Sequence, residues 1–472
     1  MQPADIDREL VAANPWWKDP SGWEEEDVQL RAARSSPLSY EPRPLDDLRA
    51  GGLYVLRGPR RVGKSTALKQ LVSRRIDEQG ARPRAILYLS VEGRSAQDVA
   101  DIVRRGAASF LTGEAGDRMW LLDEITGVHG EWPATIKRLR DSHPSFARDT
   151  VVLTGSSASK FDEAQKWLGG RRSASDSDRV LLQMGFTDLL DAIGDELPAS
   201  PRLHPLEVGN PDACERALSQ VRPWTDTLVQ GWDTYLRVGG YPQAVAAEVR
   251  RDAGDESALR TALWDVIQGD AFADAGLTDT QTQAILRRLS SSLSSLLSVR
   301  SVAERIDVSQ ETAARRLDAL RRSFLAFPVP REQGLAPKPR SQSKWYFTDP
   351  ALARLASTQG AGQPPDESAL SEQQIGLALL RRLERERTGA AVRHDSLLYY
   401  RSSTNAEIDF VSPEFSSTCV ESRFVDRGWG RAFQTIAASG FATGMVATRS
   451  GLRRHEIGWA LPAGVLGYLL GG

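Results

Sequence analysis

Two glycines separated by four residues precede a lysine and two hydroxyl residues near position 60 of the chain. Gly58 and Gly63 enclose the segment Pro-Arg-Arg-Val, and Lys64, Ser65 and Thr66 follow. In this G-x-x-x-x-G-K-[ST] pattern, glycines let the backbone bend around phosphate groups while its amides point inward. The lysine neutralises the β- and γ-phosphates, and the serine hydroxyl holds Mg²⁺. The pattern therefore predicts a site for a nucleoside triphosphate with magnesium.

The whole loop is expected to contribute to binding. The residues that we expect to hold the nucleotide are Gly58, Pro59, Arg60, Arg61, Val62, Gly63, Lys64, Ser65 and Thr66. A helix that begins at the lysine would add partial positive charge from its N-terminus. ATP and Mg²⁺ are thus the expected cofactors, with Thr66 near the α-phosphate and Ser65 on the metal.

An acidic pair follows a second apolar run. Residues 119–122 are Met-Trp-Leu-Leu, and Asp123 and Glu124 come next. A magnesium ion bound to a nucleotide needs an acidic partner at the end of a neighbouring strand. We therefore expect Asp123 near the metal and Glu124 beside the attacking water. A helix cap after a core strand is the simpler alternative for this pair.

Further polar groups follow the next apolar run. The segment "TVVLTGSS" offers Thr154 and Ser156 to the γ-phosphate or the water, and "LGGRRS" places Arg171 and Arg172 on a loop. One of these arginines could act across a subunit contact, although most surface arginines have no such role. The expected catalytic residues are Glu124, Lys64, Thr154, Ser156, Arg171 and Arg172.

Strands that alternate with helices must position these groups. The apolar runs "LYVL", "AILYLSV", "MWLLDE" and "TVVLTGS" alternate with segments of helical period between residues 50 and 192. This pattern is typical of a parallel sheet covered by helices. The carboxyl ends of parallel strands meet at one edge, where we expect the loop and the acidic pair.

Length and composition suggest several domains. A chain of 472 residues, at roughly 150 per domain, predicts about three. Breaks rich in proline, glycine and polar residues lead us to expect an N-terminal extension over 1–49, a P-loop domain over 50–214, a helical domain over 215–356 and a last domain over 357–472. The 40% hydrophobic content excludes a disordered chain, and the net charge of -2 excludes a polycation.

Cysteines and hydropathy point to the cytoplasm. Cys214 and Cys419 lie far apart, which argues against a disulfide framework and a thiolate metal site. The start "MQPADIDREL" lacks the pattern of a secretory signal, and no uncharged apolar run reaches the roughly 18 residues of a membrane helix. We expect a cytoplasmic protein without membrane contact.

Residues 298–329 have the pattern of a helix-turn-helix followed by a strand. Ser309 is the expected N-cap of the second helix. Residues 300–322 hold six arginines and four acids, a surplus too small to establish DNA binding. The groups that would contact phosphate are Arg315, Arg316, Arg321 and Arg322, with Lys338, Arg340 and Lys344 nearby. Packing within the protein is an equal alternative.

The ordered set of motifs resembles a family of prokaryotic AAA-superfamily ATPases. The matching segments are "NPWW", "RGPRRVGKST", "LLDEIT", "TGSSA", "LGGRR", "YLRVGGYPQAV", "WYFTDPAL" and "AEIDFV". The resemblance implies an α/β fold: a P-loop AAA-type ATPase domain with a parallel sheet, then a helical and winged-helix region, then a small α/β restriction-nuclease-like domain. It implies no particular cellular task.

The same resemblance assigns positions near the C-terminus. In restriction-type nucleases, clustered carboxylates bind Mg²⁺, and a lysine two residues after the last carboxylate acts on water. Glu372, Asp409 and Glu421 stand in the carboxylate positions, with Glu407 as an extra candidate. Arg423 stands where the lysine belongs, and a guanidinium cannot serve as a base. We expect a degenerate nuclease fold used for binding.

Three functions remain open from the sequence. The first is an ATPase whose nucleotide state repositions the winged-helix and nuclease-like domains, on nucleic acid, on a protein partner or within a homo-oligomer. The second is a slow nucleotide-gated regulatory module. The third is an ATP-dependent nuclease.

Overall fold

The computed structural model describes residues 2–38, 40–169, 177–194, 197–198, 210–250, 253–268, 278–358, 363–386, 396–415 and 417–471. These residues divide into two compact units, 2–182 and 183–471. Each unit has its own sheet and its own hydrophobic core. The division at residues 214 and 356 stays a prediction.

The first unit is built on a parallel sheet of five strands. The strands are β1 (Leu53–Arg57), β2 (Ile86–Ser90), β3 (Met119–Asp123), β4 (Thr150–Thr154) and β5 (Asp178–Val180), in the spatial order β2-β3-β4-β1-β5. The apolar runs correctly predicted β1 to β4, and the first four strands pair in parallel. Strand β5 lacks an apolar run, and nothing in the sequence indicated it.

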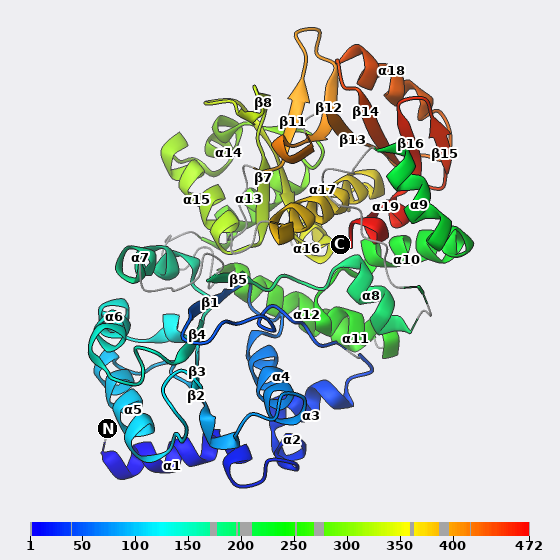
Figure 1. Ribbon diagram of the computed structural model, residues 1–472. Helices are drawn as coiled ribbons and strands as arrows, with labels where there is room; N and C mark the ends of the chain where they lie inside the picture. The colour runs from blue at the N-terminus through cyan, green and yellow to red at the C-terminus, as the bar shows by residue number, and fades with distance from the viewer. Residues whose placement is uncertain are drawn as a thin grey trace. The chain divides into compact units, whose positions relative to one another are not determined.

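Helices cover both faces of this sheet. They are α1 (Pro3–Ala13), α2 (Trp23–Glu26), α3 (Val28–Ser35), α4 (Lys64–Asp77), α5 (Ala96–Ser109), α6 (Trp132–Ser142) and α7 (Ala158–Leu168), with short 3-10 turns η1 (Pro15–Trp17), η2 (Pro83–Ala85) and η3 (Ile125–Gly127). Figure 1 shows α4 on one side of the sheet and α5 and α6 on the other. The chain crosses from β1 to the edge strand β2 and then returns through β3 to β4. Because crossovers between parallel strands are right-handed, this reversal places α4 on one face of the sheet and α5 and α6 on the other.

The N-terminal segment protects the edge strand β2. The Asn14 side chain donates to the Tyr88 carbonyl over 2.9 Å and accepts from the Tyr88 amide over 2.7 Å. The indole of Trp17 donates to the Ile86 carbonyl over 2.9 Å, and that of Trp16 does so over 3.3 Å. An open strand edge presents unpaired backbone groups. The "NPWW" segment satisfies three of them with side chains.

The second unit combines many helices with short strands. Its helices are α8 (Phe186–Ile193), α9 (Pro211–Val221), α10 (Thr225–Val238), α11 (Pro242–Arg250), α12 (Ala253–Val266), α13 (Asp279–Ser290), α14 (Val299–Ile306), α15 (Gln310–Arg322), α16 (Pro350–Thr358), α17 (Glu367–Glu386), α18 (Gly430–Ala438) and α19 (Ala463–Leu470), with short 3-10 turns η5 (Arg222–Trp224) and η8 (Pro413–Phe415). A three-stranded antiparallel sheet joins β6 (Leu296–Leu297), β10 (Ser343–Phe347) and β7 (Ala326–Val329), and β8 (Glu332–Gln333) pairs with β9 (Ala336–Pro337).

Helices α14 and α15 lie where the sequence predicted the two helices of a helix-turn-helix. The Ser309 hydroxyl accepts from the Thr312 amide over 3.1 Å, so this residue caps α15 as expected. Three of the arginines on these helices, Arg300, Arg321 and Arg322, pair with acids of their own helix. Asp318 pairs with Arg321 over 2.7 Å and with Arg322 over 2.9 Å. One carboxylate is thus shared by two arginines, and the formal surplus counted from the sequence is unchanged.

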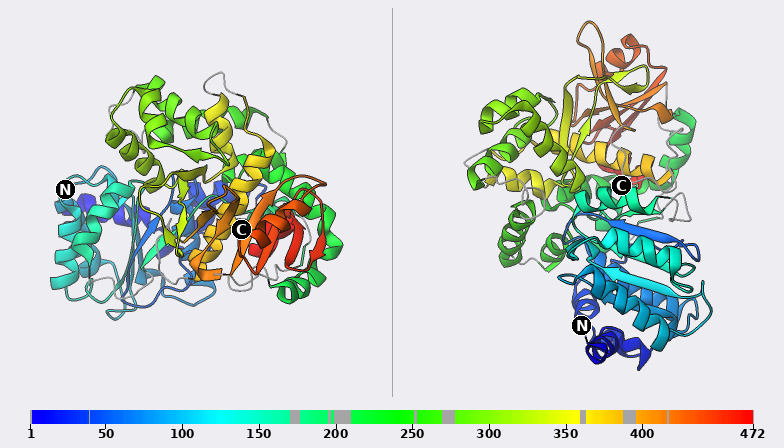
Figure 2. Two further views of the ribbon diagram at one scale, coloured as in Figure 1. Left: turned by 90° about the horizontal axis from the view of Figure 1, so that it is seen from above. Right: turned by 90° about the vertical axis from the view of Figure 1, so that its left-hand side faces the viewer.

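A six-stranded mixed sheet ends the chain. Its strands are β11 (Leu398–Arg401), β12 (Glu407–Val411), β13 (Thr418–Arg423), β14 (Thr443–Thr448), β15 (Arg453–His455) and β16 (Gly458–Pro462), in the order β11-β12-β13-β14-β16-β15. Figures 1 and 2 show α17 and α18 on opposite faces of this sheet. The apolar C-terminal segment forms β16 and the buried helix α19. Among the described residues, no helix has the length and apolar character needed to cross a membrane.

Candidate nucleotide site

The loop between β1 and α4 depends on backbone conformations that favour glycine. Gly58 has φ +147°, and a Cβ added there would lie 2.0 Å from the Leu181 carbonyl oxygen. Gly63 has φ +94° and stands directly before α4. Arg61 also adopts a left-handed conformation, with φ +66°. A side chain at position 58 would displace the loop from its neighbouring segment, so the first glycine of the motif is required by space and conformation.

Lys64 lies across this loop instead of extending into solvent. Its side chain is buried, and its ammonium donates to the Gly58 carbonyl over 3.0 Å and to the Pro59 carbonyl over 2.8 Å. The first backbone bond at the start of α4 runs from the Ala67 amide to the Gly63 carbonyl, over 2.8 Å. Amides earlier in a first helical turn have no carbonyl partner within the helix. The loop therefore presents an ammonium and a helix N-terminus together, which suits an anion.

Asp123 ends β3 and is held by two hydroxyl groups. It is buried, accepts from the Tyr88 hydroxyl over 2.9 Å, and accepts from the Thr154 hydroxyl. Thr154 ends the neighbouring strand β4, and its hydroxyl also accepts from the Glu124 amide over 3.1 Å. A carboxylate can accept about four hydrogen bonds, so Asp123 keeps lone pairs for a cation. The residue types fit a magnesium ion.

Glu124 follows the strand in a left-handed conformation, with φ +54°. Burial raises the pKa of its carboxyl above the usual range, and the charges of Lys64 and Arg60 oppose that shift. These opposing charges reach Glu124 only because the loop and the acidic residue lie close together. The Ser156 hydroxyl lies 3.5 Å from the Glu124 carboxylate. A non-glycine residue at positive φ stores strain, and such strain is common at functional sites.

The structure thus brings most of the sequence-predicted groups to one edge of the sheet. Lys64, Asp123, Glu124, Thr154 and Ser156 all lie at the carboxyl ends of β1, β3 and β4 or in the segments that follow them. Arg171 and Arg172 lie outside the described residues.

Sequence reasoning missed one contributor to this edge. Tyr88 was counted only as a residue of an apolar strand, yet its hydroxyl reaches Asp123 from β2. Burial and the nearby Asp123 carboxylate raise the pKa of Tyr88, which keeps the hydroxyl a donor. No motif spacing links the two residues. The parallel register, which pairs Ser90 with Asp123, could have indicated that they are neighbours.

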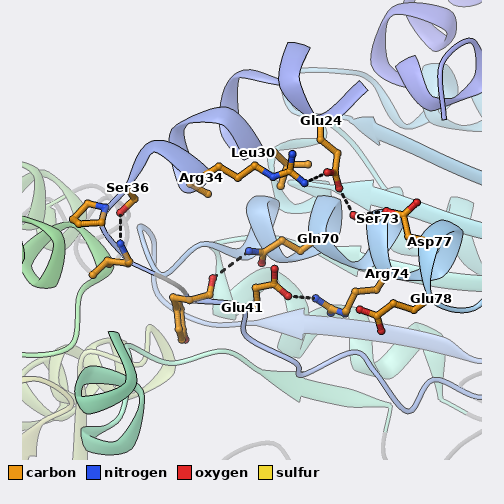
Figure 3. Close-up of a pocket in the computed structure, with 14 residues that line it drawn as sticks. Glu24, Leu30, Arg34, Ser36, Glu41, Gln70, Ser73, Arg74, Asp77 and Glu78 are labelled. Atoms are coloured by element: carbon orange, nitrogen blue, oxygen red, sulfur yellow. Dashed lines mark hydrogen bonds and ion pairs between the residues drawn. The ribbon is translucent and has the colours of Figure 1, made fainter. Parts of the chain in front are cut away.

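A second hollow lies along α4, beyond the loop. It has a volume of 390 Å³ and lies between α3, the segment after it and α4, as Figure 3 shows. Its charged groups bond to one another: Arg34 pairs with Glu24, and Arg74 pairs with Glu41 over 3.7 Å. None of residues 58–66 lines it. This hollow is separate from the loop of residues 58–66, and its Arg74–Glu41 pair joins α4 to the segment after α3.

The predicted carboxylates of the second unit also come together. The Asp409 carboxylate accepts from the Ser422 amide over 2.8 Å, and the Glu421 carboxylate accepts from the Asp409 amide over 3.1 Å. Arg423 pairs with Glu421 over 2.6 Å. Glu372 and Asp409 share a cation, described next.

Lys344 supplies that cation from β10. Its ammonium lies 2.7 Å from Asp409, 2.9 Å from Glu407 and 3.2 Å from Glu372, and its side chain is 1% exposed. The sequence-based expectation that Lys344 helps to contact nucleic-acid phosphate is therefore wrong, because a buried and fully paired ammonium cannot reach a ligand in solvent. Lys344 comes from a strand 65 residues before Asp409, and no sequence pattern links it to these carboxylates.

Two carboxyl groups of this cluster, those of Glu372 and Glu421, have raised pKa values. Burial raises the pKa of Glu372 to about 7, and the nearby Asp409 charge adds to that shift, while Lys344 opposes it. Burial likewise raises the pKa of Glu421 well above its usual range. Within the part of the chain that the structure describes, no group of three or more His, Cys, Asp or Glu side chains is arranged to hold a metal ion.

Two family models match parts of the chain. Residues 51–188 match the AAA domain, and residues 229–362 match a domain of unknown function. No curated protein matches the sequence.

The solved structures that this chain resembles are distant in sequence. A Walker-type ATPase of Pyrococcus abyssi is 11% identical, with a TM-score of 0.39, over 72% of this chain and 95% of its own. The ORC2 protein of Aeropyrum pernix, solved as ADPNP–ADP complexes, is 12% identical, with a TM-score of 0.32, over 72% and 94%. A RuvB protein of Thermotoga maritima is 13% identical, with a TM-score of 0.28, over 73% and 92%. The family match and the strand order carry the assignment: the N-terminal region has the α/β fold of a P-loop ATPase-like AAA domain.

Proposed function

We propose that this protein binds ATP with magnesium at the loop of residues 58–66 and hydrolyses it. The observation that carries the proposal is the position of Lys64. Its buried ammonium lies over the loop carbonyls, and its charge also acts on Glu124. A cation held between a phosphate cradle and an acidic pair is what transfer of a γ-phosphoryl group to water requires.

Each residue then has a defined task. The loop amides and Lys64 hold the β- and γ-phosphates, and Thr66 lies in the first turn of α4, near the α-phosphate. Magnesium, held by Ser65 and Asp123, would neutralise charge on the phosphates. Glu124 orients and polarises the water for in-line attack on the γ-phosphate, with Ser156 beside its carboxylate.

The turnover of ATP by the purified full-length protein tests this proposal. Lys64→Ala should abolish steady-state hydrolysis while leaving the circular dichroism spectrum intact. Arg104→Ala is the control that also removes one positive charge, since Arg104 is exposed on α5 and pairs with Asp101 of the same helix over 2.8 Å. Unchanged turnover in Lys64→Ala would remove the assignment.

We further propose that the nucleotide state alters the arrangement of the helix-turn-helix region and the C-terminal sheet. A slow nucleotide-gated regulatory module is the alternative. ATP turnover measured with and without single- and double-stranded DNA distinguishes these two functions. DNA should increase the turnover of an ATPase that acts on nucleic acid. A role for Arg171 or Arg172 across a subunit contact belongs to the same proposal, and it requires an oligomer whose activity falls when inactive subunits are mixed in.

The C-terminal carboxylates support binding over cleavage, and this too is a proposal. Lys344 already neutralises Glu372 and Asp409 from within the fold, so less negative charge is left for a metal ion. The presence of a lysine beside carboxylates nevertheless favours an ATP-dependent nuclease as the second candidate. Incubation with plasmid, Mg²⁺ or Mn²⁺ and ATP decides between them: cleavage that disappears in Asp409→Ala would establish the nuclease.

A further inference from the structure

The second unit contains a basic pocket that the proposed ATPase reaction does not use. Its volume is 720 Å³, and it lies among α13, α14, the end of α16 and the segment before α17. Three arginines line it: Arg287 and Arg288 from the last turn of α13, and Arg305 from the last turn of α14. Asp366 is the one acidic residue among its lining residues. The three arginines and one aspartate leave a formal surplus of two positive charges.

These arginines differ from the other arginines of the same region. Within the described residues, no carboxylate forms an ion pair with Arg287, Arg288 or Arg305. By contrast, Arg300 on α14 pairs with Glu304 over 2.7 Å. A cluster of cations without carboxylate partners costs free energy through like-charge repulsion, and an anionic ligand would relieve that cost.

The first two guanidinium groups are held in place by neutral partners. Arg288 donates through Nε to the Ser301 hydroxyl over 3.3 Å, and that hydroxyl donates to the Ser298 carbonyl over 2.8 Å. Arg287 donates through one terminal nitrogen to the Gln283 side chain over 3.1 Å, while its buried Nε has no hydrogen-bond partner among the residues that the structure describes. Their remaining N–H groups are available to a ligand.

The serine hydroxyls of the pocket donate hydrogen bonds to backbone carbonyls. Ser291 donates to the Arg288 carbonyl over 3.1 Å, and Ser357 donates to the Arg354 carbonyl over 2.7 Å. The donors left for a ligand are therefore mainly guanidinium N–H groups. Guanidinium groups present a planar fork of donors that matches the oxygens of a phosphate group. A phosphate monoester carries about -1.5 to -2 charges at pH 7, which matches the surplus in the pocket.

We propose that this pocket binds a small phosphorylated molecule of about mononucleotide size. Its volume falls within the range of about 300–1,000 Å³ that is typical of small-molecule sites. A concave site suits a small molecule better than the convex backbone of a duplex, and no residue of α15 lines it. The proposal concerns the second unit and holds whether or not the loop at residues 58–66 binds ATP.

Calorimetric titration of the full-length protein tests the proposal, with Lys64→Ala as the background so that the loop does not contribute. Inorganic pyrophosphate and AMP are the probes. We expect Arg288→Gln and Arg305→Gln each to weaken binding by about tenfold or more, because each removes charge-assisted hydrogen bonds to the ligand. Arg300→Gln is the matched control on α14, and we expect unchanged affinity, since its charge is already paired outside the pocket.

The titrations distinguish a free phosphate compound from a nucleotide as the ligand. Binding of pyrophosphate alone identifies a free phosphate compound as the ligand, and binding of AMP identifies a nucleotide; both support the proposal. Absence of heat with either probe, from protein with an unchanged melting temperature, overturns it. Equal affinity in the pocket variants and the control overturns it as well. If a short DNA oligonucleotide binds through Arg288 while the small probes do not bind, the pocket is a nucleic-acid surface and the proposal is wrong.

Discussion

Glu124 is the residue on which the proposed reaction depends most. Its amide donates to the Thr154 hydroxyl, its conformation is left-handed, and the residue is half-buried near the charges of Lys64 and Arg60. Each of these features fixes the carboxyl at the edge of the sheet instead of leaving it to rotate in solvent. Strain at this position is compensated by the buried strand that precedes it.

Glu124→Gln should separate binding from hydrolysis. The amide has nearly the same shape as the carboxylate but cannot accept the proton or polarise water, so we expect turnover to fall by about 10²–10⁴-fold. The affinity for Mg-ATP should remain, because the loop is unchanged. Single-turnover hydrolysis and equilibrium binding measure the two quantities. Parallel losses of affinity and rate would contradict the assigned role.

The pH dependence of turnover should reflect the raised pKa of Glu124. The carboxyl acts only when deprotonated, so activity should fall as the pH drops through a value above the ordinary 4.5 of glutamate. The nearby Glu92 charge contributes to the raised pKa. Glu92→Gln should therefore shift the acid limb of the kcat/KM profile to lower pH. If Glu92→Gln leaves the acid limb in place or shifts it to higher pH, a group other than Glu124 controls the loss of activity at low pH.

At the scale of elements, apolar runs predicted most of the first sheet. Strands β3 and β4 could be predicted because each buried run ends in a polar residue, at Asp123 and Thr154. Strand β5 could not, since its three residues are only half buried and alternate in charge. The contact of Lys344 with Asp409 joins residues far apart in sequence, and no local pattern encodes such a contact.

The start of α3 attaches the N-terminal segment to α4. Asp27 accepts from the Gln29 amide over 2.9 Å and the Leu30 amide over 3.0 Å, and pairs with Lys69. Asp27→Ala should lower the free energy of unfolding by about 1–2 kcal/mol, chiefly through the lost cap. Asp27→Asn retains a capping oxygen and should lose less. Urea denaturation compares the two, and equal losses would show that the ion pair matters more than the cap.

Strand β10 holds the carboxylate cluster of the second unit together. Lys344→Met should lower the free energy of unfolding by about 3–5 kcal/mol, because it leaves buried carboxylates without a cation. Adding Asp409→Asn to that variant should recover part of the loss. Denaturation midpoints of the single and double variants check this. A further decrease in the double variant would mean that Asp409 is stabilised by groups other than Lys344.

At the scale of the whole molecule, each of the two units contains one site that we propose to bind an anion. The first presents a buried ammonium and a helix N-terminus at the edge of a parallel sheet. The second presents, in a pocket of 720 Å³, arginines that form no ion pair with a carboxylate of the described residues. The first was predictable because its motif is contiguous in sequence. The second was not, because α13 and α14 contribute their arginines from separate helices.

Calorimetric titration of Mg-ATP into the purified full-length protein tests the central claim most directly. The account predicts saturable uptake that is lost in Lys64→Ala and retained in Glu124→Gln, since only the first variant removes the ammonium over the loop. The Arg104→Ala control should bind as the unmodified protein does. Absence of uptake by well-folded protein, or uptake that Lys64→Ala leaves unchanged, would contradict the account.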